Sequence, residues 1–89
     1  MPSALLAVDV PKDVSLVPTF WLNIETTLSK VEGASMLTGS LLLFQLPLTL
    51  PFLGLVTGEL RTGQVTYLVS FFSDKPEFER FEPAKLVTE

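Results

Sequence analysis

The sequence contains no cysteine and no histidine. Without cysteine no disulfide can hold the fold together, so its stability depends on packing. The two absences also exclude zinc sites built on thiolate or imidazole ligands, and any cysteine or histidine nucleophile–base pair within this chain. Charge is scarce too, because only 18% of the 89 residues are Asp, Glu, Lys or Arg.

Basic residues are few and dispersed, and the net charge is −4. The six are Lys12, Lys30, Arg61, Lys75, Arg80 and Lys85. A nucleic-acid surface depends on clustered Lys and Arg that contact phosphates, and no cluster occurs here. We therefore expect no nucleic-acid partner.

Groups for catalysis or metal binding are also missing. Most carboxylates lie in expected loops or near the C-terminus, and none has the spacing of a catalytic pair or of a cation-binding loop. The stretch "TGELRTG" lacks the lysine and the following helix of a phosphate-binding loop. We expect no catalytic residue, no metal site and no cofactor, and hence no enzyme.

The N-terminal stretch "MPSALLAVDVPKD" has no basic residue before its apolar part and reaches Asp9 and Pro11 early. It does not fit a secretory signal or a transit peptide. We expect an intracellular protein or a subunit of an assembled particle.

Apolar residues, in contrast, are abundant: 47% of the chain is hydrophobic. The length allows one domain, residues 1–89, and a domain this small buries a limited share of its surface. The excess apolar content predicts a surface that a protein partner or a second copy covers.

Local patterns favour β structure. Residues 3–10 alternate as in a strand. Residues 19–32 fit a strand by composition, but they also carry a helical stripe of Phe20, Ile24, Leu28 and Val31, and both alternatives stay open. A hairpin is expected in residues 53–71, with Gly63 in a left-handed turn and Leu53 opposite Phe71.

The uncharged run 33–58 allows two interpretations. It is longer than the ~20 residues that cross a bilayer, so a single membrane span over residues 36–56 is the alternative. Against a span stand Pro47 and Pro51, which would interrupt a helix, and the lack of a positive flank. The stretch "FQLPLTLPF" instead alternates large apolar residues with Gln45, Pro47, Thr49 and Pro51, which predicts an edge strand with one apolar face.

The run "GLVTGELRTGQVTYLVSFFSDKPEFERFEPAKLV" resembles the C-terminal half of small SH3-like barrels. In those barrels a hairpin is followed by an aromatic-bearing loop, a single turn (here "EPAK") and a short closing strand ending in "LV". The resemblance implies a closing strand within the charged segment 73–89. It also implies a role as an accessory or docking subunit, by analogy of fold alone.

The expected fold is mainly β: a small antiparallel barrel or sandwich of about five strands, with room for one short helix. The expected function is a non-enzymatic interaction or structural subunit of a larger or self-associated assembly. The residues expected to make the contacts are Phe44, Leu46, Leu48, Leu50, Phe52, Trp21, Phe78 and Phe81.

Overall fold

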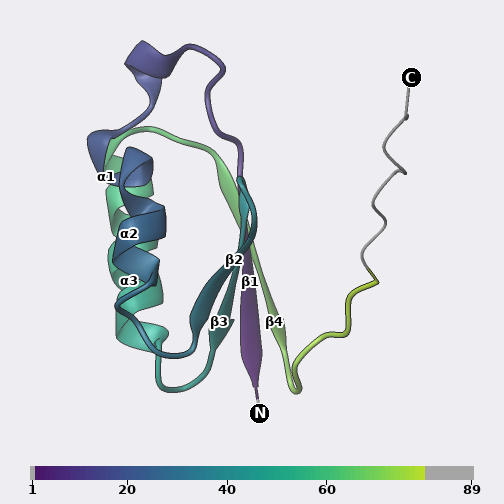
Figure 1. Cartoon of the computed structure of the whole chain (residues 1–89). Coiled ribbons are helices and arrows are strands. Elements are labelled where there is room, and N and C mark those ends of the chain that lie inside the picture. Colours follow the sequence, from purple (N-terminus) through teal and green to yellow (C-terminus); the bar gives the residue numbers. More distant parts are fainter. Residues whose placement is uncertain (1, 80–89) are drawn as a thin grey trace, which may run out of the picture.

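A computed structural model describes residues 2–79 of the chain (Figure 1). Along the chain the elements are β1 (Ser3–Val8), the 3₁₀ turn η1 (Val14–Leu16), α1 (Thr19–Leu22), α2 (Ile24–Leu28), β2 (Ala34–Thr38), β3 (Leu41–Gln45), α3 (Leu50–Thr62) and β4 (Tyr67–Phe72). The fold is thus mixed α/β, not mainly β.

The four strands form one open antiparallel sheet in the order β2-β3-β1-β4. With helices between β1 and β2 and between β3 and β4, this is the ferredoxin-like, or split β-α-β, topology. The expected closed barrel is wrong, because the sheet ends at two separate edges, β2 and β4.

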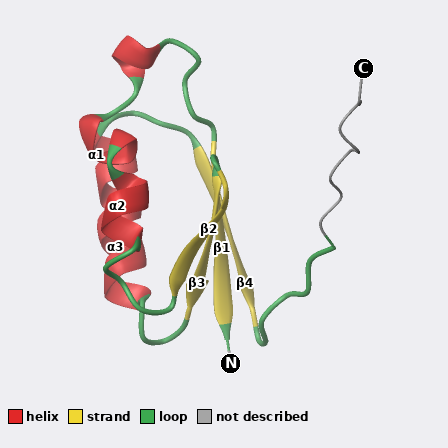
Figure 2. Ribbon diagram, in the orientation of Figure 1, coloured by secondary structure: helices red, strands yellow, loops and turns green. Residues whose placement is uncertain are grey.

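The helices all lie on one face of the sheet, and residues 73–79 run on the other side (Figures 1 and 2). The core fills the space between helices and sheet. Its buried members are Ala4, Leu6, Val8, Trp21, Ile24, Leu28, Leu42, Phe44, Leu53, Val56, Leu60 and Val65. Here the sheet contributes every second residue of β1 and β3, as the two-residue period of a strand requires.

The first strand matches its prediction. Residues 3–8 are extended, and Ala4, Leu6 and Val8 point into the core. The strand ends before Asp9, whose amide still donates to the carbonyl of Thr66 at 2.8 Å. Alternation of side chains is therefore a reliable signal at this position.

For residues 19–32 the helical alternative holds. Two short helices, α1 and α2, meet at Asn23, and Ile24 and Leu28 bury the helical stripe against the sheet. The segment leaves the helix through Gly33, whose φ of +88° is a conformation that glycine adopts most easily. The strand that composition favoured is wrong here.

The stretch "FQLPLTLPF" is not an edge strand. Phe44 and Gln45 end β3, a turn follows, and α3 begins at Leu50 with Pro51 in its first turn. Proline is well suited to that place, because the first amides of a helix have no intrahelical acceptor. The Thr49 hydroxyl donates to the Gln45 carbonyl at 2.8 Å and joins the strand to the helix.

The expected hairpin in residues 53–71 is also wrong. Leu53, Val56 and Leu60 follow the spacing of one helix face and are buried against the sheet. Gly63 caps the helix with φ −80°, and the positive φ of 58° belongs to Gln64.

The second half of the expected hairpin is β4, which pairs with β1. Leu6 lies opposite Val69 and Ala4 opposite Phe71. The SH3-like barrel that the resemblance implied is therefore not the fold, and the predicted turn "EPAK" and closing strand lie outside the described residues.

The run 36–56 is divided among β2, β3 and the start of α3. Within residues 2–79 no helix has the length and apolar character of a transmembrane segment.

Candidate interaction surfaces

The face of the sheet opposite the helices of residues 2–79, called the open face below, is apolar. Its side chains alternate with those of the core along each strand, as the strand register shows. None of the strand residues on this open face is charged. Its apolar members are Leu5, Ala7, Leu37, Leu41, Leu43, Leu68 and Phe72, and its polar members are Ser3, Ser35, Thr38, Gln45 and Ser70.

This composition is unusual for an antiparallel sheet with one face in water. Such a sheet normally alternates apolar and polar residues, whereas strands covered on both faces form continuous apolar runs. The runs "ALLAV" in β1 and "LLLF" in β3 are of the second kind. The open face therefore has the composition of a buried surface.

Part of the open face lies beneath the chain's own C-terminal segment. Residues 74–78 enclose, with Ser35, Leu37 and Leu43, a hollow of about 790 Å³. Leu43 is only 7% exposed, whereas Leu68, at the far edge of the same face, is 73% exposed. Coverage thus concentrates on β2 and β3 and leaves β4 open.

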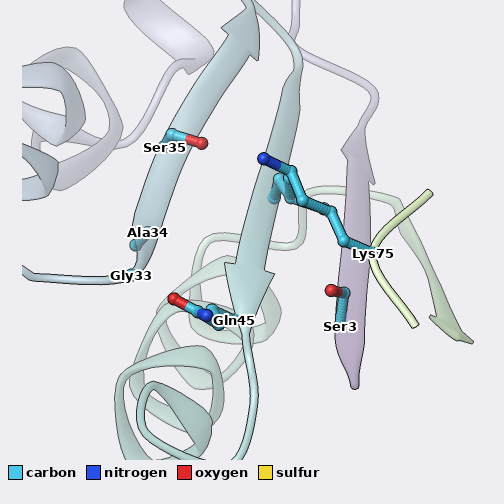
Figure 3. A pocket seen from close by; sticks show the side chains of 7 residues that line it. Ser3, Gly33, Ala34, Ser35, Gln45 and Lys75 are labelled. Carbon is cyan, nitrogen blue, oxygen red and sulfur yellow. The ribbon is translucent and has the colours of Figure 1, made fainter. Parts of the chain in front are cut away.

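A smaller hollow of about 330 Å³ lies at the end of β3, lined by Ser3, Gly33, Ala34, Ser35, Leu43, Gln45 and Lys75. Figure 3 shows the Lys75 side chain reaching over this region, together with the hydroxyls of Ser3 and Ser35 and the amide of Gln45. These groups can hydrogen-bond to a polar ligand, but the lining has no carboxylate to act as a base.

The helical side carries a second apolar surface. A groove of about 250 Å³ between the α1–α2 pair and α3 is lined by Phe20, Ile24, Thr27, Phe52, Leu55, Val56 and Glu59. Leu55 is 60% exposed there. This groove is narrower than the sheet face, and Glu59 places a carboxylate at its side.

The Asp13 carboxyl is held by Ser15 at the start of the 3₁₀ turn η1. Hydrogen bonds from the Ser15 hydroxyl, at 2.8 Å, and from its backbone N–H, at 3.0 Å, hold the pKa of the exposed Asp13 carboxyl below its usual value. This pair fixes the 3₁₀ turn η1, so its role is local structure. Among residues 2–79 there is no group of carboxylates that could hold a metal ion.

The residues predicted to make contacts separate into two groups. Phe44 and Trp21 are buried in the core at 0% and 6% exposure, and Leu46 and Phe52 pack against it. The edge strand that was expected to present Phe44, Leu46 and Phe52 on one face does not form, and Trp21 lies on α1.

The remaining predicted contact residues are exposed where the structure describes them. Leu48, Leu50 and Phe78 are 63%, 51% and 51% exposed. They come from the turn before α3, the first turn of α3 and the C-terminal segment, and not from the single edge strand that was expected. Phe81 lies outside the described residues.

The open-face residues were missed by the sequence interpretation. Leu5, Leu41 and Leu68 were not among the residues predicted to make contacts. The signal that reveals them is the apolar character of both parities in "ALLAV" and "LLLF".

No family model, no curated protein and no solved structure matches this chain.

Proposed function

We propose that the protein is a non-enzymatic interaction subunit that binds another protein through the open face of its sheet. The observation that carries this proposal is the apolar composition of a sheet face whose strand residues carry no charge and which no helix of residues 2–79 covers. A contiguous exposed apolar patch on a small protein typically marks a protein or membrane contact site.

A protein partner fits this surface better than nucleic acid does. Phosphate contacts need clustered cations, and Lys75 is the one cation that lines the hollows over the open face in residues 2–79. The net charge of −4 acts against binding to any polyanion. The same charge disfavours the negatively charged leaflet of a membrane.

Catalysis has no support in the geometry. Asp74 and Glu77 line the larger hollow over the open face, whereas the hollow of about 330 Å³ at the end of β3 has no carboxylate in its lining; the chain has no cysteine or histidine. A nucleophile needs a base within hydrogen-bond reach, and the hollow provides hydroxyls without one.

The test places a charge on the open face and compares it with the same charge on the helical groove. Leu41→Glu changes the open face at the start of β3, and Leu55→Glu changes the groove. In native extracts of the source, the wild-type chain is expected in a complex larger than its own 9.8 kDa. Leu41→Glu should weaken that complex at least about tenfold, because the new carboxylate would be buried without a partner.

Leu55→Glu should leave the complex intact, and circular dichroism should show that both variants keep the wild-type fold. A folded Leu41→Glu variant that stays in the complex would contradict the assignment to the open face. A wild-type chain that migrates as a free monomer in native extracts would contradict the function itself.

A further inference from the structure

The fourth strand is an edge of the sheet, and half of its backbone groups point away from β1. The Asp9 amide donates to the Thr66 carbonyl, so Asp9 and Thr66 form a hydrogen-bonded pair. Counting every second pair along the ladder from there gives Ala7–Leu68, Leu5–Ser70 and Ser3–Phe72. In an antiparallel ladder these alternate pairs exchange the hydrogen bonds.

The intervening residues Tyr67, Val69 and Phe71 therefore direct their N–H and C=O groups outward. Within residues 2–79 no strand lies beyond this edge.

This edge has none of the usual protection. Edge strands are normally kept from pairing by Lys, by proline, by a bulge or by short length. β4 is six residues long, "YLVSFF", with neither charge nor proline, and its register with β1 is regular. The opposite edge, β2, is shorter and has a register shift between Met36 and Thr38. Of the two edges, β4 is the one suited to accept a further strand.

We propose that the occupant of this edge is a second copy of the chain, which pairs β4 with β4 in antiparallel orientation about a two-fold axis at Val69. The two sheets then become one sheet of eight strands (twice the four of one chain). This proposal goes beyond the binding function of the open face, because it rests on the edge of the sheet and not on its face.

The sequence of β4 is complementary to itself in this register. Val69 pairs with Val69 of the second copy, and each Tyr67 pairs with Phe71 of the second copy. In both pairs the outward N–H and C=O groups of one copy face those of the other, so the two strands can exchange backbone hydrogen bonds. Cross-strand pairs of aromatic and β-branched residues contribute roughly 0.2–1 kcal/mol each.

Exposure and charge agree with this arrangement. Phe71 shares the core-facing parity of Ala4 but is 64% exposed, because within residues 2–79 no strand lies on the outer side of β4. The Tyr67 ring of a second copy would cover it. On the open face Leu68 would lie opposite Ser70 of the second copy, so no two like charges face each other along the edge.

The helix beside this edge leaves room for a second molecule. Arg61 Nε donates to the Tyr67 hydroxyl at 2.7 Å, which places that flank of α3 above β4. Gly54 and Gly58 lie on the same flank, seven and three residues earlier, and a Cβ atom added to either would have no neighbour within 4 Å. Two copies of α3 can therefore approach across the axis, with the two Arg61 side chains at opposite ends.

The test measures mass against concentration for the purified chain by sedimentation or light scattering. The wild type should move from 9.8 kDa towards twice that mass. Because edge contacts of this size fall below the standard interface of about 800 Å² per partner, we expect a dissociation constant on the order of 1–100 μM. Phe71→Lys should raise that constant at least about tenfold, since the ammonium would lie beside Arg61 of the second copy.

Two controls accompany this variant. Ser35→Lys adds the same charge at the β2 edge and should leave the dimer unchanged. Amide exchange gives a second readout: the Tyr67, Val69 and Phe71 amides should be protected only at high concentration. The Leu68 and Ser70 amides, which face β1, should be protected at every concentration.

A wild-type chain that stays monomeric up to about 0.5 mM would overturn the proposal, as would a Phe71→Lys variant that dimerises like the wild type. Outward amides that stay protected in the dilute monomer would also overturn it, because the chain's own residues would then occupy the edge. Leu41→Glu should dimerise normally, so a failure of the edge proposal is distinguishable from a failure of the open-face function.

Discussion

Truncating the Phe44 side chain tests whether this residue stabilises the core, as the structure indicates, or makes surface contacts, as the sequence predicted. Its side chain is fully buried in β3, and its ring centroid lies 6.0 Å from that of Phe52. Its cross-strand neighbours on both sides are alanines, Ala4 and Ala34. These short side chains cannot move into the space that a truncation would leave.

The expected cost follows from this packing. Phe→Ala changes in cores cost about 3–5 kcal/mol, and the two alanine neighbours place this one at the upper end. A chain of 89 residues is stable by roughly 4–13 kcal/mol, so Phe44→Ala would bring it close to unfolding. Phe44→Leu deletes three carbons and should cost about 2 kcal/mol, which leaves the fold measurable.

The assay is urea unfolding followed by the fluorescence of Trp21, the single tryptophan, which is 6% exposed in the folded chain. Phe44→Leu should lower the midpoint by roughly 1–2 M. Phe78→Leu, at a position that is 51% exposed, is the matched control and should change stability by less than about 0.5 kcal/mol. Equal, small effects at the two positions would show that Phe44 does not fill the core.

Three further changes test local features. Gly54→Ala, in the open flank of α3, should stabilise the dilute monomer by about 0.5–1 kcal/mol in urea unfolding, and an unchanged midpoint would contradict a helix there. Gly63→Ala should destabilise by about 1–3 kcal/mol, since its Cβ would lie 2.7 Å from Pro18 Cγ; a neutral result would refute this close approach. Ser15→Ala should raise the pKa of Asp13 in a carboxyl NMR titration, because it removes the hydroxyl donor. Since the folded pKa of Asp13 is lowered, the stabilisation by its carboxylate is present above the unfolded pKa of about 3.9 and is lost as the pH falls through the folded pKa.

The sequence predicted the secondary structure correctly where the apolar residues followed only one periodicity. In β1 the alternation of Ala4, Leu6 and Val8 identifies both the strand and its buried face. In residues 19–28 the helical spacing of Ile24 and Leu28 competed with a composition typical of strands. The segment is helical because the apolar stripe of a helix can pack on the core-facing side of the sheet.

Proline and glycine misled the interpretation of residues 44–63 for physical reasons. Pro51 was taken as evidence against a helix, but at the start of a helix its missing N–H costs nothing. Gly63 was taken as the turn of a hairpin, yet α3 runs to Thr62 because Leu53, Val56 and Leu60 bury one full face. Tertiary burial thus outweighed local propensity, and the helical spacing of Leu53, Val56 and Leu60 is the signal in the segment that indicates this outcome.

The candidate surfaces were harder to predict, since they depend on which elements become neighbours. The excess of apolar residues correctly indicated more apolar surface than one core can hide. Its location, however, follows from the placement of all three α-helices on one side of the sheet. Leu5 and Leu41 lie on the opposite side of the sheet, where they are half-buried, because the β2-β3-β1-β4 order leaves an open sheet.

The two proposed surfaces meet at β4, and this has an energetic consequence. Leu68 belongs to the open face, and it also lies opposite Ser70 of the second copy across the proposed two-fold axis. Pairing at the edge would therefore join two open faces into one continuous apolar surface. A partner that contacts both open faces binds with higher overall affinity, because its second contact forms at a high effective concentration once the first has formed.

By thermodynamic reciprocity, such a partner strengthens the dimer by the same factor as the dimer strengthens partner binding. Phe71→Lys, which lies outside the open face, should then weaken the partner complex as well as the dimer. A partner complex that is insensitive to Phe71→Lys would show that the open face of one copy suffices and that the two surfaces act independently.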